Sequence, residues 1–181
     1  TFWQHYENKP YSPVNLYAAT KQAFEVISQY YRETSSLFFT TLYLNDTYGP
    51  GDTRKKILNI WSSMKDSDVL DMSPGAQKIN LLHIDDVVDG YIKLIELVQN
   101  GNLSKDSSSS FVLKGKEDLT LRQLSVLFER IAGKKLIINW GGLQYKNREV
   151  MSVWDRGMVV PGWAPRVSID EGFKQFIMLT Q

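Results

Sequence analysis

Tyr17 and Lys21 are the pair of side chains in this sequence best suited by type and spacing to acid–base chemistry. They stand four residues apart, and on a helix residues i and i+4 lie on one face, so the phenol and the ammonium would be neighbours. A nearby ammonium stabilises a phenolate, which lowers the pKa of a phenol from about 10 and suits it to proton transfer. One such spacing arises by chance about as often as not. Its interpretation therefore depends on the surrounding sequence.

The surrounding residues favour a helix that begins just before the pair. Pro13 fits a helix start and Asn15 is a candidate N-cap. Apolar side chains recur at helical spacing and predict a buried stripe, formed by Leu16, Ala19, Ala23, Ile27 and Tyr30. The alanines at 18 and 19 leave room for a ligand to lie against the helix.

Composition excludes several classes of protein. The 181 residues are 43% hydrophobic and 23% charged, which is ordinary for a globular domain. The formal net charge of +1 provides no broad basic surface for nucleic acid. The absence of cysteine excludes disulfides and cysteine nucleophiles, and two histidines make a zinc site improbable. No apolar run is long enough to span a membrane, so we expect a cytoplasmic protein without a metal.

A candidate binding loop follows the helix. Residues 36–44 are aromatic and β-branched enough for a buried strand of a parallel sheet, and residues 45–52 are rich in turn formers. Open α/β sheets bind ligands where strands end, so this loop is a candidate wall of the site. Arg54 is a candidate contact for phosphate oxygens, with a solvated surface charge as the equal alternative.

The remaining pattern alternates short strands and helices. We expect strands at 69–72, 111–113 and 135–140, a strand leading into a helix over 79–98, a helix capped by Thr120 that ends at Gly133, and a terminal helix capped by Ser168 with Glu171. Asp85 and Asp86 are interpreted as helix caps in preference to acid–base groups, and His83 as structural. Residues 101–110 form a serine-rich surface loop.

Four motifs, in this order, resemble the extended short-chain dehydrogenase/reductase superfamily, in its nucleotide-sugar epimerase/dehydratase branch. They are Tyr-x-x-x-Lys at 17–21, Tyr-Gly-Pro-Gly-Asp at 48–52, His-x-Asp-Asp-Val-Val at 83–88 and Gly-Trp-x-Pro at 162–165. The resemblance implies an α/β fold, the C-terminal part of a Rossmann-type parallel sheet plus a small α/β substrate-binding domain. Residues 1–50, with 79–100 and 111–114, would belong to the dinucleotide-binding domain. Residues 51–78 and 115–181 would form the substrate domain.

The resemblance also implies roles for individual residues. Tyr17 would be the catalytic acid or base, Lys21 would lower its pKa and bind the nicotinamide ribose, and Thr1 or a neighbour would hold the substrate oxygen. Leu44 and Asp46 would join Tyr17 and Lys21 in binding the cofactor, and Asp46, Arg54 and Arg148 would bind substrate. The sequence departs from the family at Asp46, usually Asn, and at Tyr43 and Ile79, usually Arg. In the family these positions face substrate or cofactor.

The implied activity is that of an NAD(P)-dependent nucleotide-diphosphate-sugar epimerase or 4-ketoreductase at sugar C4. The resemblance is greatest to CDP-abequose synthase-like enzymes, which use CDP- or dTDP-linked deoxysugars in bacterial surface polysaccharide and O-antigen synthesis. The family's dehydratases have an Asp-Glu pair after the catalytic threonine, whereas Phe2 and Trp3 follow Thr1 here. An epimerase or reductase is therefore the preferred interpretation. The resemblance also implies a homodimer for the full-length enzyme.

The sequence has no Gly-x-x-Gly-x-x-Gly loop to hold the pyrophosphate of NAD or NADP. In the family that loop lies well over a hundred residues before the tyrosine, so we expect this chain to be a C-terminal portion that is inactive by itself. The alternative function is a non-catalytic nucleotide-sugar-binding or interaction module with the same partial fold. The Tyr17–Lys21 pair favours the enzyme, and the lost arginines at Tyr43 and Ile79 mildly favour the module.

Overall fold

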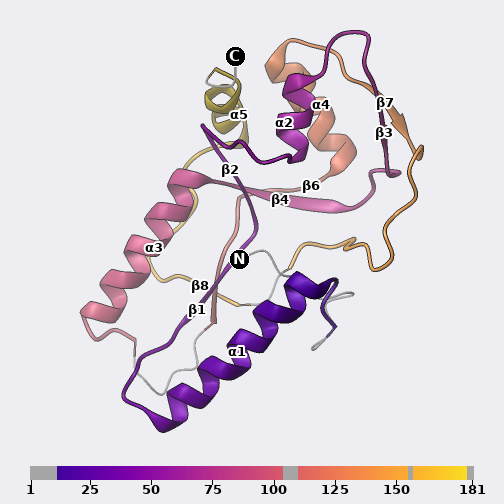
Figure 1. Cartoon of the computed structure of the whole chain (residues 1–181). Helices are drawn as coiled ribbons and strands as arrows, with labels where there is room; N and C mark the ends of the chain where they lie inside the picture. The colour runs from indigo at the N-terminus through magenta and orange to yellow at the C-terminus, as the bar shows by residue number, and fades with distance from the viewer. Residues whose placement is uncertain (1–11, 104–109, 155–156, 179–181) are drawn as a thin grey trace.

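Parallel strands and flanking helices build an α/β fold over residues 12–103, 110–154 and 157–178, the parts of the chain that the computed structural model describes (Figure 1). The helices are α1 (Leu16–Thr34), α2 (Ile57–Ser63), α3 (Ile84–Gln99), α4 (Leu121–Ala132) and α5 (Ile169–Met178). The strands fall into three small sheets, and each sheet contains a parallel pair.

The first sheet contains β1 (Thr41–Leu44), β5 (Ser110–Leu113) and β8 (Met158–Val159), all parallel, with β5 in the centre. Its register places Leu42 opposite Phe111. The expected strand at 36–44 is thus confined to its last four residues. The short β8 lies in this sheet although the expected division places it in the substrate domain, because only the fold shows where the chain returns after residue 157.

The second and third sheets lie farther from α1 than the first sheet does (Figure 1). In the second, β4 (Lys78–His83) pairs with β2 (Asp46–Tyr48) in parallel and with β6 (Asp118–Thr120) in antiparallel orientation. In the third, β3 (Val69–Met72) pairs with β7 (Ile137–Trp140). The strands β2 and β6 lie where the sequence indicates turns or a helix cap. Each has only three residues, which is too short for an alternating pattern to predict a strand.

Asn45 marks the point where the chain passes from the first sheet to the second. Its backbone N–H and its side-chain Nδ2 both donate to the carbonyl oxygen of Leu113, at 3.4 and 3.1 Å. Asn45 is buried, and these bonds replace the ladder pairing that the chain gives up between β1 and β2. The carboxyl end of β1 is thereby fixed against the end of β5.

Two buried clusters hold the fold together. One joins α2, α4 and α5 over the second and third sheets and includes Trp61, Phe128, Phe173 and Phe176, with Tyr48. The second packs α3 on the first sheet through Leu82, Val87, Leu94, Phe111 and Leu113, with Val160. In α4, Leu121, Leu124 and Phe128 are buried at helical spacing, and Thr120 and the left-handed Gly133 cap its ends as expected.

The prediction of a buried apolar stripe on α1 is wrong for the described chain. Leu16, Ile27 and Tyr30 are 80%, 52% and 62% exposed, whereas Ala18 and Ser28 are buried. The face that α1 turns toward the described residues is the polar one. Amphipathic spacing predicts that a helix has an apolar face, but the surface that covers it is decided by tertiary packing.

Within the described residues no helix is long and apolar enough to cross a membrane. The same residues contain no group of three His, Cys, Asp or Glu side chains placed to hold a metal ion.

Candidate active site

The Tyr17–Lys21 pair lies on the first two turns of α1. Asn15 caps the helix as expected, since its Oδ1 accepts a hydrogen bond from the Ala18 N–H at 2.8 Å. The Lys21 ammonium lies 5.3 Å from the centre of the Tyr17 ring, so the two groups share one face. Half of the Tyr17 side chain (51%) is exposed. The phenol is therefore open to a ligand and has a cation beside it.

The orientation of α1 places this pair at the carboxyl end of β1. Figure 1 shows α1 running antiparallel to β1, and Glu25 of α1 forms a side-chain hydrogen bond with Tyr43 of β1. Tyr17 lies eight residues before Glu25, about 12 Å along the helix axis. Asp46 lies three residues after Tyr43, about 10 Å along the strand. Tyr17 and Asp46 are therefore displaced in the same direction, toward the edge where such sheets bind ligands.

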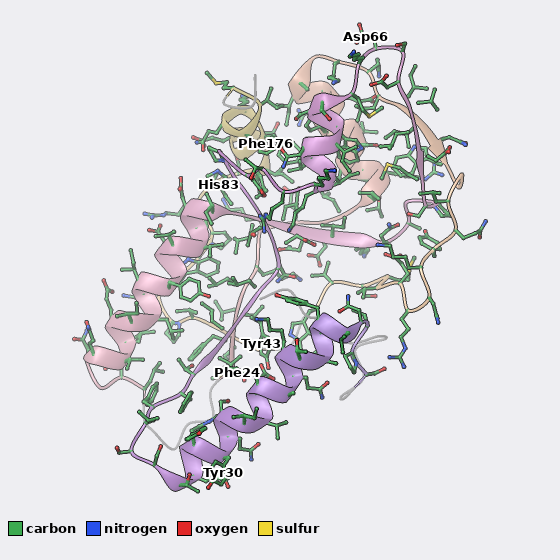
Figure 2. All side chains as sticks on the ribbon, in the orientation of Figure 1. Phe24, Tyr30, Tyr43, Asp66, His83 and Phe176 are labelled. Carbon is green, nitrogen blue, oxygen red and sulfur yellow. The ribbon has the colours of Figure 1, made fainter. Side chains whose placement is uncertain are left out.

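Tyr43 is directed at α1 (Figure 2). Burial, and then the nearby Glu25 carboxylate, raise the pKa of Tyr43 to about 12, so its hydroxyl stays protonated and donates to Glu25. Its ring also packs on Trp154, with 5.9 Å between ring centres. The Tyr43 side chain thus fixes α1 to the sheet.

Asp46 lines a pocket between β2, α2, β4 and α5, which we call the Asp46 pocket. Its polar lining includes Asp46, Thr47, Asp52, Lys56 and Asn59, and its apolar lining includes Ile57, Leu58, Ile79, Leu81 and Phe176. The Lys56 ammonium lies 3.4 Å from the Asp46 carboxylate. Burial raises the pKa of Asp46, and Lys56 and Arg54 oppose that rise.

Arg54 forms a tight pair within the loop. Its Nε and Nη2 donate to the two oxygens of Asp52 at 2.7 and 2.6 Å, and Nη2 also donates to the Thr47 carbonyl at 3.2 Å. This bidentate contact holds the pKa of Asp52 below its usual value. Binding of a diphosphate by Arg54 remains a prediction, and it would require the guanidinium to exchange a fixed partner for the ligand.

The Arg148 side chain contacts the backbone just before the start of α1. Its Nη1 donates to the Pro13 carbonyl at 2.7 Å, although 135 residues separate them. Arg148 also has a left-handed backbone (φ 64°), which is costly for a residue with a side chain. Arg148 and Tyr17 thus lie near the same helix start. The role of Arg148 toward a diphosphate remains a prediction.

The remaining predicted residues are placed as follows. Leu44 is the last residue of β1 and precedes Asn45, so it lies at the ligand-binding edge, but its contact with cofactor remains a prediction. Thr1 lies outside the described residues. The pairing of Lys56 with Asp46 was not predicted from the sequence. Its only signal was a lysine at the start of a predicted helix, next to an equivalent lysine at 55.

The caps of α3 differ from the expectation. His83 is the N-cap, and its Nδ1 accepts from the Asp85 N–H at 3.3 Å. Asp86 is buried and accepts from the N–H groups of Arg166 and Val167, at 2.8 and 3.1 Å. It therefore holds the Gly-Trp-x-Pro segment against α3 and does not cap its own helix. Figure 2 shows His83 in the upper body of the molecule, toward α5 and Phe176.

Comparison with known proteins decides the family. The sequence profile described as "NAD dependent epimerase/dehydratase family" matches residues 4–106, which is more than half of the chain. The chain belongs to this family. The match includes α1, the Asp46 loop and α3, and therefore Tyr17, Lys21 and Asp46, whereas Arg148 lies outside it.

Curated relatives of this family member include two CDP-abequose synthases. That of Yersinia pseudotuberculosis is 29% identical over 140 residues, 77% of this chain and 47% of the relative. That of Salmonella muenchen is 25% identical and covers 100% of this chain and 61% of the relative. The chain thus spans about half the length of the curated relatives that it matches.

The fold is shared with solved structures of the family. UDP-glucuronic acid 4-epimerase from Bacillus cereus, in complex with UDP-glucuronic acid and NAD, superposes with a TM-score of 0.80 at 19% identity, covering 99% of this chain and 56% of that one. UDP-glucose 4-epimerase from Thermotoga maritima, with UDP-glucose, gives 0.72 at 18% identity, covering 99% and 57%. These comparisons support a Rossmann-type α/β fold for the member described here.

Proposed function

We propose that this protein is an NAD(P)-dependent nucleotide-diphosphate-sugar epimerase or 4-ketoreductase that acts at sugar C4. The observation that carries the proposal is the exposed Tyr17–Lys21 pair at the carboxyl end of β1. A phenol beside an ammonium at a ligand-binding edge is suited to moving the proton of a sugar hydroxyl. The CDP-abequose synthase relatives support a deoxysugar pathway of bacterial surface polysaccharides as its setting.

In the proposed reaction the Tyr17 oxygen takes the proton of the C4 hydroxyl as the ketone forms, and returns a proton when the ketone is reduced. Lys21 stabilises the phenolate between these steps through its charge. NAD or NADP, when bound, supplies the acceptor and donor of the hydride that leaves and returns to C4. Among the described residues, Tyr17 and Lys21 would contact such a group, because the phenol is half exposed with the Lys21 ammonium beside its ring.

The test is Tyr17→Phe in the full-length protein, with Tyr30→Phe as the matched control on an exposed part of the same helix. We expect Tyr17→Phe to reduce turnover of a nucleotide sugar by about 10²–10⁴-fold, because it removes only the proton-transfer group. Substrate affinity, measured by calorimetry, should change little, and Tyr30→Phe should keep wild-type turnover.

Unchanged turnover in Tyr17→Phe would rule out this mechanism. Binding of a nucleotide sugar by the wild-type protein without turnover, with cofactor supplied, would favour the non-catalytic module. The division into a dinucleotide-binding part and a substrate part, the choice between CDP and dTDP, and the homodimer belong to this same proposal.

A further inference from the structure

His83 carries a buried hydrogen-bond donor that no described residue satisfies. The residue is 2% exposed, and its Nδ1 accepts a hydrogen bond from the Asp85 N–H at 3.3 Å. The Asp85 carboxylate lies 3.6 Å from the same nitrogen, which is beyond the usual range of a hydrogen bond. A nitrogen that accepts carries no proton, so the ring is neutral and its proton is on Nε2. Nε2 is buried and has no hydrogen-bond partner among the described residues.

The ring of His83 lines a pocket between β2, β4, residues 115–117 and the start of α5, which we call the His83 pocket. Its volume of about 70 Å³ exceeds what one water molecule needs. The ring carbon Cδ2, which is bonded to Nε2, lies against Gly172 of α5, where an added Cβ would be 3.1 Å away. The edge of the ring that carries Nε2 is therefore turned toward α5.

Tyr48 brings a second polar group to the same place. It is 4% exposed, and its ring meets the ring of His83 edge to face, with 5.4 Å between the ring centres. Burial, and then the charge of Asp86, raise the pKa of Tyr48, so its hydroxyl keeps its proton. A Cβ at Gly172 would overlap the Tyr48 oxygen. An imidazole N–H and a phenol O–H thus meet beside α5, with the Asp86 carboxylate nearby.

The charges of the His83 pocket decide which kind of ligand fits these donors. Three acids and one base line it: Asp86, Glu117, Asp170 and Lys116. An anion would be repelled by the surplus of carboxylates. An apolar group would leave the buried Nε2–H without an acceptor, which costs free energy. A water molecule can accept from Nε2–H and donate to a phenol or carboxylate oxygen, so it satisfies both kinds of group.

We propose that the His83 pocket binds an ordered water molecule that accepts a hydrogen bond from His83 Nε2–H and links it to Tyr48 and Asp86. The histidine of the His-x-Asp-Asp-Val-Val motif then has two tasks. Its Nδ1 caps α3, and its Nε2 joins β4 through water to β2 and α3. This inference goes beyond the proposed function, because it involves neither the Tyr17–Lys21 pair nor a nucleotide sugar.

The test combines a high-resolution crystal structure of the full-length protein with long-range ¹⁵N NMR spectra of its imidazole rings. The crystal structure should contain an ordered oxygen about 2.7–3.2 Å from His83 Nε2. The NMR spectra should show a neutral ring with its proton on Nε2. The signal of His83 is assigned by its loss in His83→Gln.

Three variants separate the water site from the helix cap. His83→Gln retains a side-chain N–H donor and should keep the ordered oxygen, whereas His83→Phe has a ring without a donor and should lose it. Asp85→Asn is the matched control, because this exposed residue keeps its backbone N–H and does not line the pocket. It should retain both the oxygen and the Nε2–H form. If His83→Phe does not fold, as judged by circular dichroism, the wild type and Asp85→Asn still decide the question.

Four results would overturn the inference. These are a proton on Nδ1, the absence of an ordered oxygen at Nε2, an oxygen that persists unchanged in His83→Phe, and a saturable shift of the His83 signal when inorganic phosphate is added. The last result would identify an anion site in place of a water site. The effect of Tyr17→Phe on turnover is independent of all four, so the proposed function stands or falls separately.

Discussion

At the scale of single residues, Glu25 and Tyr43 show how this chain joins α1 to its sheet. Burial raises the pKa of Glu25, and the hydrogen bond from Tyr43 and the charge of Arg32 lower it by less. The fourth-residue spacing continues from Tyr17 through Lys21 to Glu25. The hydrogen bond between Glu25 and Tyr43 therefore fixes the position of Tyr17 relative to β1.

A pH-dependent effect on stability follows for Glu25→Gln. Because the pKa of Glu25 in the folded protein is raised above 4.5, the folded state binds this proton more readily than the unfolded state. The contribution of Glu25 to the free energy of unfolding must then fall as pH rises from 4.5 through the raised pKa. We expect Glu25→Gln to gain stability relative to wild type over that range in urea denaturation. Glu33 is exposed on the same helix, and the free energy of unfolding of Glu33→Gln should vary with pH as that of the wild type does. The same pH dependence in Glu25→Gln would contradict this prediction.

At the scale of elements, α3 organises the segment that leads into α5. The two neighbouring acids at its start have different tasks. Asp85 is exposed and favourable near the positive end of the helix dipole. Asp86 is buried, accepts two backbone hydrogen bonds from Arg166 and Val167, and its carbonyl accepts from the Trp163 indole at 3.1 Å. One buried carboxylate thus ties two distant parts of the chain.

These tasks predict unequal losses of stability in a matched pair of variants. Asp86→Ala leaves two partly buried backbone N–H groups without their acceptor, so we expect it to lower the free energy of unfolding by about 2–4 kcal/mol. Asp85→Ala removes only a surface charge and should cost about 1 kcal/mol or less. Urea denaturation at pH 7 measures both, and losses of similar size would show that Asp86 is not the tie described above.

At the scale of the whole molecule, the apolar face of α1 is left uncovered by the described chain. Leu16, Phe24, Val26, Ile27, Tyr30 and Tyr31 are each between 46% and 80% exposed. Contiguous apolar surface of this kind favours association in water. The polar face of the same helix already packs on the described chain, so rotation of α1 would not bury it without breaking the Glu25–Tyr43 contact.

We therefore expect the 181-residue chain, expressed by itself, to self-associate at micromolar concentration. Sedimentation velocity should show species larger than 20.8 kDa. The double change Phe24→Ser with Tyr30→Ser should shift the distribution toward the monomer, whereas Val126→Ser, a similarly exposed residue on α4, should not. A monomeric wild-type chain would contradict this prediction.

What the sequence determined by itself is local. The Asn15 cap, the Thr120 cap with Gly133, and the shared face of Tyr17 and Lys21 all follow from spacings of three or four residues, which helix geometry fixes wherever the helix lies. These parts were predictable because the partners are near in the chain. The α/β fold was implied by the resemblance of four short motifs to the epimerase/dehydratase family.

The tertiary structure alone decided the contacts between distant residues. Arg148 with Pro13, Asp86 with Arg166, and Lys56 with Asp46 depend on how sheets and loops bring segments together, which residue spacing does not encode. The same reason explains why the face of α1 was predicted but its exposure was not. An apolar stripe predicts that one face of a helix needs to be covered, and only the packed molecule shows whether another surface covers it.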